Sequence, residues 1–162
     1  PLTNFLTPQS TGQLISGAGE YPFKDASISG FPLIKDSSEK FIKTIYLAQI
    51  EGISLGCLGH ASEIPEPAVL EYFEEVDILF VPAGGSPFLN QQAAVKIIKQ
   101  LQPKIIIPSF FKVTGLKRPA GKPDFLFEEF NGKKEKESQE KLTIKKKDLN
   151  EIKKTDVVLL NL

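Results

Sequence analysis

The sequence predicts a mixed α/β fold built around a strand–helix–strand unit in residues 76–112. Residues 77–81 form a short apolar run closed by proline and glycine, as in strands buried on both faces. After Asn90, a typical N-cap, apolar residues recur at the i, i+3, i+4, i+7 spacing of one helix face. Residues 104–107 supply a second buried strand. This order predicts a right-handed crossover between parallel strands, which places a site at their carboxyl ends.

Other elements are predicted around this unit from β-branched residues, turn signals and apolar spacing. Residues 13–16 suggest a short strand, while residues 20–33 and 41–58 suggest two antiparallel hairpins. Residues 68–75 suggest a helix entered through two prolines, and residues 156–160 suggest a final strand. The crossover is therefore expected to have antiparallel strands before it and a further strand after it.

We expect a single domain over residues 1–162, incomplete at its front end, because the chain opens in loop-like sequence without a methionine. Residues 112–140 are predicted to form an exposed loop and a charged insertion, with a short amphipathic helix at 125–130. Residues 141–162 are predicted to form C-terminal edge strands. The first of these strands is expected at 141–146, where polar and apolar residues alternate.

Composition indicates an ordinary globular domain without a bulk charge. The chain is 41% apolar and 25% charged, with a net charge of zero, so it has no general attraction for nucleic acid or an anionic membrane. Residues 1–111 hold 7 lysines and 11 acids, whereas residues 112–162 hold 13 lysines and arginines and 9 acids. We favour a solvated lysine face over an RNA contact, so a nucleic-acid partner is not expected.

A single cysteine, Cys57, excludes an internal disulfide and fits a reducing compartment, so we expect a cytoplasmic protein. No apolar run approaches the ~18 residues of a membrane helix. The chain also shows no charged-then-apolar leader. Association with a membrane is therefore not expected.

Five segments follow one another in an order and spacing that also occur in a known family. They are Gly17-Ala-Gly-Glu-Tyr21, Ala26-Ser-Ile-Ser-Gly30, the hairpin at 44–58, Val76-Asp-Ile-Leu-Phe-Val-Pro-Ala-Gly-Gly85 and Pro103-Lys-Ile-Ile-Ile-Pro108. In these segments the chain resembles the metallo-β-lactamase-fold proteins, in particular the Zn-dependent hydrolases of the β-lactamase superfamily. The resemblance covers nearly the whole chain and corresponds to the C-terminal two-thirds of such a domain.

The resemblance implies an α/β (α+β) fold of the αββα sandwich type, two facing sheets with helices outside, here incomplete at the N-terminus. It also implies one or two metal ions, usually zinc, at the edge between the sheets. Such a metal activates water for attack on an ester, amide or phosphodiester bond. Zinc is thus the cofactor, and a small molecule with an ester or phosphodiester bond the substrate, that the resemblance leads us to expect.

The chain departs from the family at its metal-ligand positions. The main ligand motif of the family, H-x-H-x-D-H, is absent from this sequence, which holds one histidine. Gly59-His60 stands where the family often has a metal-bridging aspartate. Ser109-Phe110-Phe111 stands where the family has its last histidine ligand, and a phenyl ring cannot bind zinc. We therefore expect a metal site that is impaired or absent in this chain.

His60 is the one candidate metal ligand. It follows a predicted strand and lies where a site is expected, so it can serve as a substituted ligand or a general base. The alternative, a loop histidine that is exposed or bonded to backbone, is favoured because no Cys or carboxylate stands at metal-ligand spacing from it. Nearby Glu63 could join His60, but a role in capping the next helix is favoured.

Other polar features carry weaker signals, and we assign no catalytic and no cofactor-binding residue. Gly84-Gly85 could hold an anion at a helix start, but a tight turn is favoured. Ser109 lacks the motif of a nucleophile. Cys57 is predicted to be a small core residue, and Asp77 a structural one.

Three functions remain open. The first is a metal-dependent hydrolase-like protein with an altered site, and the second is a degenerate, non-catalytic member that acts as a binding or scaffold protein. The third, contact with nucleic acid, rests only on the lysines of the tail. The sequence further predicts an apolar sheet face that is exposed unless a missing segment or a second copy covers it. A homo-oligomer is therefore expected.

Overall fold

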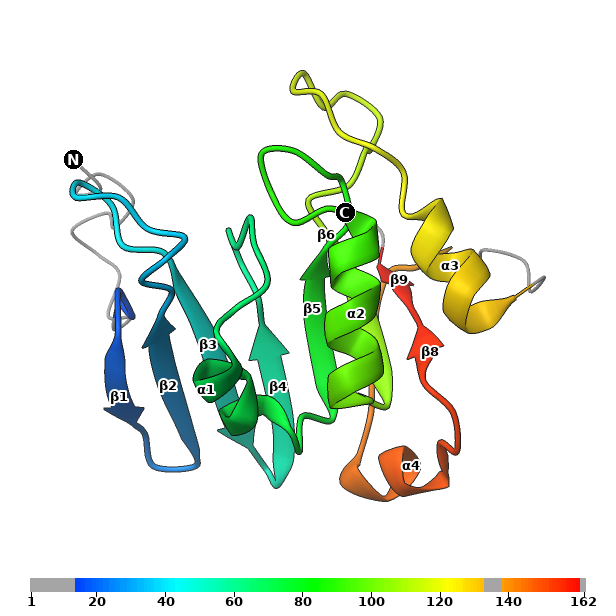
Figure 1. Ribbon diagram of the computed structural model, residues 1–162. Coiled ribbons are helices and arrows are strands. Elements are labelled where there is room, and N and C mark those ends of the chain that lie inside the picture. The colour runs from blue at the N-terminus through cyan, green and yellow to red at the C-terminus, as the bar shows by residue number, and fades with distance from the viewer. Residues whose placement is uncertain (1–13, 133–137, 161–162) are drawn as a thin grey trace.

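The computed structural model describes residues 14–132 and 138–160, which form one large sheet and one small sheet with helices around them (Figure 1). The large sheet has the strand order β1-β2-β3-β4-β5-β6-β8. Its strands are β1 (Gly19–Pro22), β2 (Ala26–Pro32), β3 (Thr44–Ile50), β4 (Ile53–Cys57), β5 (Ile78–Pro82), β6 (Ile105–Ser109) and β8 (Asp156–Val157). The small sheet pairs β7 (Ser138–Gln139) with β9 (Leu159–Leu160).

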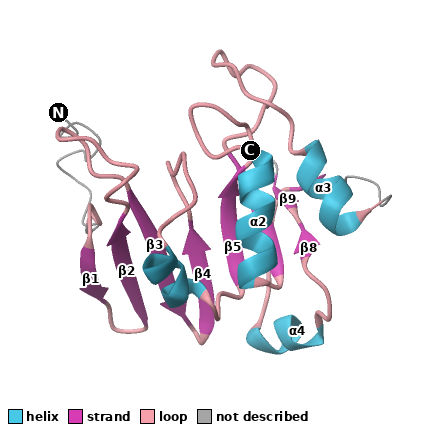
Figure 2. Ribbon diagram, in the orientation of Figure 1, coloured by secondary structure: helices cyan, strands magenta, loops and turns pink. Residues whose placement is uncertain are grey.

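The helices flank the large sheet, as Figure 2 shows. They are α1 (Pro67–Leu70), the 3-10 turn η1 (Glu71–Phe73), α2 (Gln91–Leu101), α3 (Asp124–Asn131) and α4 (Lys146–Glu151). Apolar side chains of α1, α2 and α3 join one core with the facing side of the sheet. Leu149 of α4 joins a second core on the opposite side. None of the helices in the described part of the chain has the length and apolar character needed to cross a bilayer.

The predicted crossover is confirmed. β5 and β6 pair in parallel, and α2 connects them. The Asn90 side chain accepts a hydrogen bond from the Ala93 amide at 2.8 Å, which caps the first turn of α2. The helix ends at Gln102, whose left-handed conformation (φ 48°) terminates it before Pro103. Its predicted apolar stripe is buried and comprises Ala94, Ile97, Ile98 and Leu101.

Both predicted hairpins are confirmed as antiparallel pairs, β1 with β2 and β3 with β4. The β3–β4 turn is made by Glu51 (φ 50°) and Gly52 (φ 76°). Two consecutive positive φ angles match the right-handed twist of the strands, as in two-residue hairpins. β4 then pairs in parallel with β5, which joins the antiparallel and parallel halves of the sheet.

Several predicted elements differ in the structure. Residues 14–16 of the first predicted strand are not in a strand, and residue 13 lies outside the described part. The helix predicted at 68–75 is shorter and divides into α1 and η1. The helix predicted at 125–130 is confirmed as α3, while the final strand divides into β8 and β9, which belong to different sheets.

The edge strand predicted at 141–146 is wrong. Residues 141–145 are not paired in any sheet, and α4 begins at residue 146. The alternating pattern has another cause: Leu142 and Ile144 point to one side of an extended segment and pack against the second core. Alternation in sequence reports a half-buried extended chain, whether or not its backbone finds a strand partner.

The second face of the sheet is covered over only half its width by the described residues. Near β6, the segment from Leu142 through α4 packs on it. Over β2, β3, β4 and β5 the face borders an open hollow of about 480 Å³, lined by apolar residues that include Ile28, Ala48, Leu55 and Ile50. Ile50 is 43% exposed. The predicted exposed apolar face is therefore present in the described part of the chain.

We predict weak, reversible association of the chain through this open face. Four strands spaced by ~4.8 Å give a patch on the order of 200 Å² per copy, well below the ~800 Å² per partner of a stable interface. Sedimentation velocity should show a weight-average mass that rises between about 10 and 500 μM, a range chosen for a micromolar-or-weaker equilibrium. Ile50→Lys should suppress this rise, whereas Ile64→Lys, at an isoleucine that is 44% exposed and lies outside the hollow, should not. A monomer at every concentration would contradict the prediction.

Candidate functional site

The candidate site lies at the edge of the sheet where β4, β5 and β6 end. The three strands are parallel, so their carboxyl ends meet at one edge, at the top in Figure 1. The chain leaves these ends through loops that begin at residues 58, 83 and 110. The two departures from the family pattern, His60 and Phe110, lie in the first and third of these loops.

His60 is exposed and packs its imidazole ring against two phenyl rings. The ring centroids of His60 and Phe88 are 5.4 Å apart with planes 16° apart, and those of His60 and Phe110 are 5.2 Å apart. The two phenyl rings are 4.6 Å from each other. The described residues give the imidazole no hydrogen bond. Stacking is therefore the contact that holds His60 at the strand ends.

A guanidinium group covers the same two phenyl rings. The Arg118 Cζ atom lies 5.1 Å from the Phe88 centroid and 5.8 Å from the Phe110 centroid, within the reach of a cation–π interaction. Its Nη2 atom donates a hydrogen bond to the Phe110 carbonyl at 2.7 Å. Its Nη1 atom is buried and has no partner among the described residues. A permanent positive charge is thus fixed at the strand ends.

Phe110 itself has an unusual backbone, which a glycine makes room for. Its φ is 54°, in the left-handed region that a bulky residue seldom adopts. A Cβ atom on Gly84 would lie 2.1 Å from the Phe110 carbonyl oxygen. The Gly84 carbonyl accepts a hydrogen bond from Gly121, and the Gly121 carbonyl accepts one from Lys112, both at 2.8 Å. These contacts bring the loop that carries Arg118 down onto the β5 end.

A partly buried carboxylate links two loops beside this cluster. Asp36 accepts hydrogen bonds from Lys43 Nζ at 2.7 Å, from the Ser62 amide at 2.6 Å and from the Ser62 hydroxyl. Lys43 Nζ also donates to the Ser62 hydroxyl. Burial raises the pKa of Asp36, but the hydrogen bonds from Lys43 and Ser62 outweigh it and hold the pKa below its ordinary value of 3.8. The cluster is a closed, ionised network that ties the loop after β2 to the loop after β4.

A hollow of about 350 Å³ lies next to His60, over the start of β3. Lys43 and Tyr46 contribute to its polar lining, and the Tyr46 hydroxyl accepts a hydrogen bond from the Gly17 amide at 3.0 Å. Thr44 also lines it, and the Thr44 hydroxyl is buried and has no partner among the described residues. A buried water molecule is the kind of group that satisfies such a hydroxyl.

The other residues weighed from sequence have structural positions. The Asp77 carboxylate accepts hydrogen bonds from the Ser54 amide at 2.9 Å and from Lys146 Nζ at 2.6 Å, which fastens α4 to the start of β5. The Glu63 side chain is exposed, and its backbone amide donates to Asp36 at 3.3 Å. Asp77 is therefore structural, as predicted.

Cys57, Ser109 and the glycine pair are likewise not brought together with His60 in a reactive arrangement. Cys57 is a free thiol on the open face of the sheet, and burial raises its pKa, with a weaker opposing hydrogen bond from Gly59. Ser109 accepts a hydrogen bond from Ala83 through its backbone. Gly85 has a φ of 73°, which agrees with the favoured tight turn.

Arg118 and Phe88 are the site residues that sequence reasoning missed. One signal was available for Arg118: it is the sole arginine in a chain with 19 lysines. A planar guanidinium stacks on aromatic faces and presents its N–H donors in a rigid fork, whereas the ammonium group of lysine is a compact point charge. No comparable local signal distinguishes Phe88 from the other 11 phenylalanines.

The comparisons with known proteins agree with the fold. A family model described as a beta-lactamase superfamily domain matches residues 6–109, so the chain belongs to this superfamily. No curated protein sequence matches the chain significantly. The expected metallo-β-lactamase fold is also found in solved structures, which confirm the predicted fold class.

One similar structure is a metallo-beta-lactamase superfamily protein from Thermotoga maritima, named as a Zn-dependent hydrolase. It is 24% identical, with a TM-score of 0.74 over 91% of this chain and 71% of that one. A protein named as a metal-dependent hydrolase, from Parabacteroides distasonis, is 15% identical, with a TM-score of 0.53 over 92% and 57%. A metallo hydrolase from Ignicoccus hospitalis is 17% identical, with a TM-score of 0.51 over 71% and 50%.

The described residues at this edge do not by themselves fit a zinc ion. Within residues 14–132 and 138–160, no group of three or more His, Cys, Asp and Glu side chains is close enough to hold a metal. The neighbours of His60 are two phenyl rings, which supply no ligand atom, and the guanidinium that covers them repels a second cation. The assignment of His60 as a metal ligand stays a prediction.

The Asp36 network should make stability depend on pH in acid. Because the folded pKa of Asp36 is depressed, its contribution is present above the unfolded pKa and is lost as the pH falls through the folded value. Asp36→Asn should lower the free energy of unfolding by about 1–2 kcal/mol at pH 7, with a smaller difference below about pH 4. Urea unfolding at pH 7, 5, 4 and 3 measures this. The exposed Asp25→Asn is the control, and a difference that stays constant over this range would refute the linkage.

Because Gly84 approaches Phe110 closely, a larger residue at position 84 should lower the free energy of unfolding. Gly84→Ala forces the Phe110 carbonyl away and should cost roughly 2–3 kcal/mol in urea unfolding. Gly121→Ala, in the same contact but with 3.5 Å to its nearest neighbour, should change stability by less than about 0.5 kcal/mol. Equal stability of the two variants would mean that the Phe110 backbone is not constrained as described.

Proposed function

We propose that the chain is a metallo-β-lactamase-fold, hydrolase-like protein whose metal site is impaired, with a substrate that is still to be found. Membership of the superfamily supports the hydrolase-like class. The observation that carries the impaired site is the packing of His60, Phe88, Phe110 and Arg118 at the strand ends. The superfamily's chemistry at this edge needs ligand atoms that surround a metal and leave one position open for water.

Two physical effects support this proposal. A phenyl ring at position 110 offers no lone pair, so it removes a ligand from the end of β6 where the family has a histidine. The guanidinium of Arg118 adds a positive charge within the same cluster, fixed by its hydrogen bond to the Phe110 carbonyl. Two like charges 4 Å apart repel by ~4 kcal/mol at an effective dielectric constant of 20, which weakens any metal bound beside Arg118.

Zinc binding tests the proposal. The full chain, equilibrated with zinc and passed through a desalting column, should retain well under one equivalent by elemental analysis. Phe110→His restores one imidazole and should tighten zinc binding at least about tenfold relative to Phe110→Leu, which only removes the ring. Near-stoichiometric zinc in the unaltered chain that is lost in His60→Ala would overturn the impaired site and establish His60 as a ligand.

A second candidate function is a non-catalytic binding or scaffold protein. The observation that favours it is the 350 Å³ hollow beside His60, whose lining includes Lys43, Thr44 and Tyr46. A small neutral or anionic molecule fits apolar walls with a few hydrogen-bonding groups. Under this proposal, a fragment screen by NMR shifts residues around Thr44, and Tyr46→Phe, which removes a hydroxyl from the lining, reduces those shifts, while no ester or phosphodiester substrate turns over with added zinc.

We further propose a cytoplasmic location and a small-molecule ligand in place of nucleic acid or membrane. The unpaired Cys57 supports a reducing compartment. The net charge of zero supports the absence of a bulk attraction for polyanions.

A further inference from the structure

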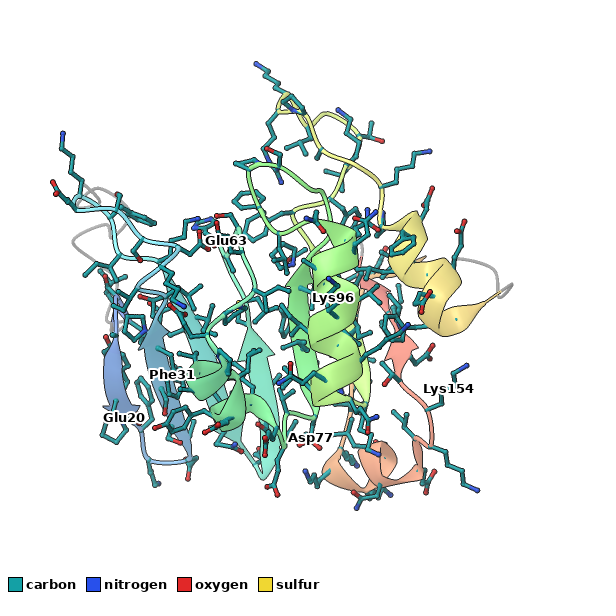
Figure 3. The ribbon with its side chains drawn as sticks, in the orientation of Figure 1. Glu20, Phe31, Glu63, Asp77, Lys96 and Lys154 are labelled. Carbon is teal, nitrogen blue, oxygen red and sulfur yellow. The ribbon has the colours of Figure 1, made fainter. Side chains whose placement is uncertain are left out.

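Another cavity lies at the opposite end of the sheet from His60. It has a volume of about 450 Å³ and is bordered by the end of α2, by α3 and by the segments that lead into β6 and β8. The amino-terminal ends of the parallel strands meet there, so it is distinct from the edge that carries the superfamily's chemistry. Figure 3 shows Lys154 on this side of the molecule, beside β8 and away from Glu63.

Four lysines from three separate segments line this cavity: Lys99, Lys104, Lys153 and Lys154. Lys99 forms an ion pair with Glu129. The other three have no carboxylate partner among the residues that the structure describes. The cavity therefore gathers positive charge that the described chain does not neutralise, although the whole sequence has a net charge of zero.

The floor of the cavity is apolar. Ile98 and Pro103 are buried, and the partly buried ring of Phe130 forms one wall. The Thr155 hydroxyl already donates to the Pro103 carbonyl at 2.7 Å. The ammonium groups and the exposed Gln102 side chain are therefore the groups left to bind a ligand, over a surface that suits a flat apolar ring.

A helix end explains only part of this arrangement. Lys99 lies in the last turn of α2, where a cation is favoured by the helix dipole. Lys153 and Lys154 come from the segment after α4, outside α2. Gathering uncompensated ammonium groups around one cavity costs free energy by mutual repulsion, and a multivalent anion removes that cost.

We propose that this cavity binds a phosphorylated small molecule of the nucleotide class. Lys104, Lys153 and Lys154 contact the phosphates, since lysine binds phosphate as a mobile point charge. The ring of the ligand packs on Phe130. A doubly or triply charged phosphate ester matches the unpaired ammonium groups better than a single carboxylate does, and its planar base uses the apolar wall that inorganic phosphate leaves empty.

Titration calorimetry of the full chain with adenosine diphosphate tests the proposal, at low salt and with a chelator present. We expect binding that weakens at least fivefold between 50 and 200 mM salt, because the contacts are ionic. Lys153→Ala/Lys154→Ala should reduce affinity at least tenfold. Lys96→Ala/Lys147→Ala removes the same charge from exposed positions outside the cavity and should leave affinity within about twofold. No binding at millimolar ligand, or equal loss in both double variants, would overturn the site.

Phe130→Leu separates the ring contact from the phosphate contacts. It should weaken adenosine diphosphate severalfold and leave pyrophosphate unchanged; a loss of both ligands alike would contradict the assigned ring contact. A short RNA that binds while the nucleotide does not would replace the proposal with a nucleic-acid surface. His60→Ala should have no effect on any of these titrations, so the test of this cavity does not depend on whether the metal site is impaired.

Discussion

Burial of β5 and β6 on both faces is the constraint on which the rest of the structure depends. On one side Leu79, Val81 and Ile106 pack under α2, and on the other Ile78 and Ile105 meet the segment that carries α4. Two buried faces leave these strands little freedom to shift in register. The carboxyl ends of β5 and β6 are therefore held at the same edge of the sheet, and the loops that follow these strands lie close together.

At this edge the rings of His60, Phe88 and Phe110 stack on one another, and the guanidinium of Arg118 covers the two phenyl rings. A metal centre would organise these loops by drawing ligands from each of them around one ion. Here Arg118 organises the loops instead. Its Nη2 atom donates to the Phe110 carbonyl and its guanidinium covers Phe88, so it joins the loop after β6 to the loop after β5. The Asp36 network joins two more, through Ser62. The edge is thus ordered by interactions internal to the described chain.

Sequence reasoning succeeded where the signals are local and failed where they are not. The crossover could be predicted because Asn90, the apolar stripe and Pro103 all lie within one short stretch and agree with one another. The altered ligand position could be recognised at Phe110 only through the resemblance. The contact of Asp36 with Ser62 spans 26 residues, and no pattern near either residue reports it. At 141–146, alternation was present but a strand partner was not.

The division of the final strand has a consequence for how the molecule unfolds. Val157 belongs to the core beneath α2 and α3, whereas the next residue, Val158, packs into the core on the opposite face. β8 extends the large sheet, and β9, which follows it directly, forms the small one. Consecutive residues of one short segment thus pack into different cores. If one core opens at this end, the segment is also pulled out of the other core. We expect them to melt together, as one cooperative unit.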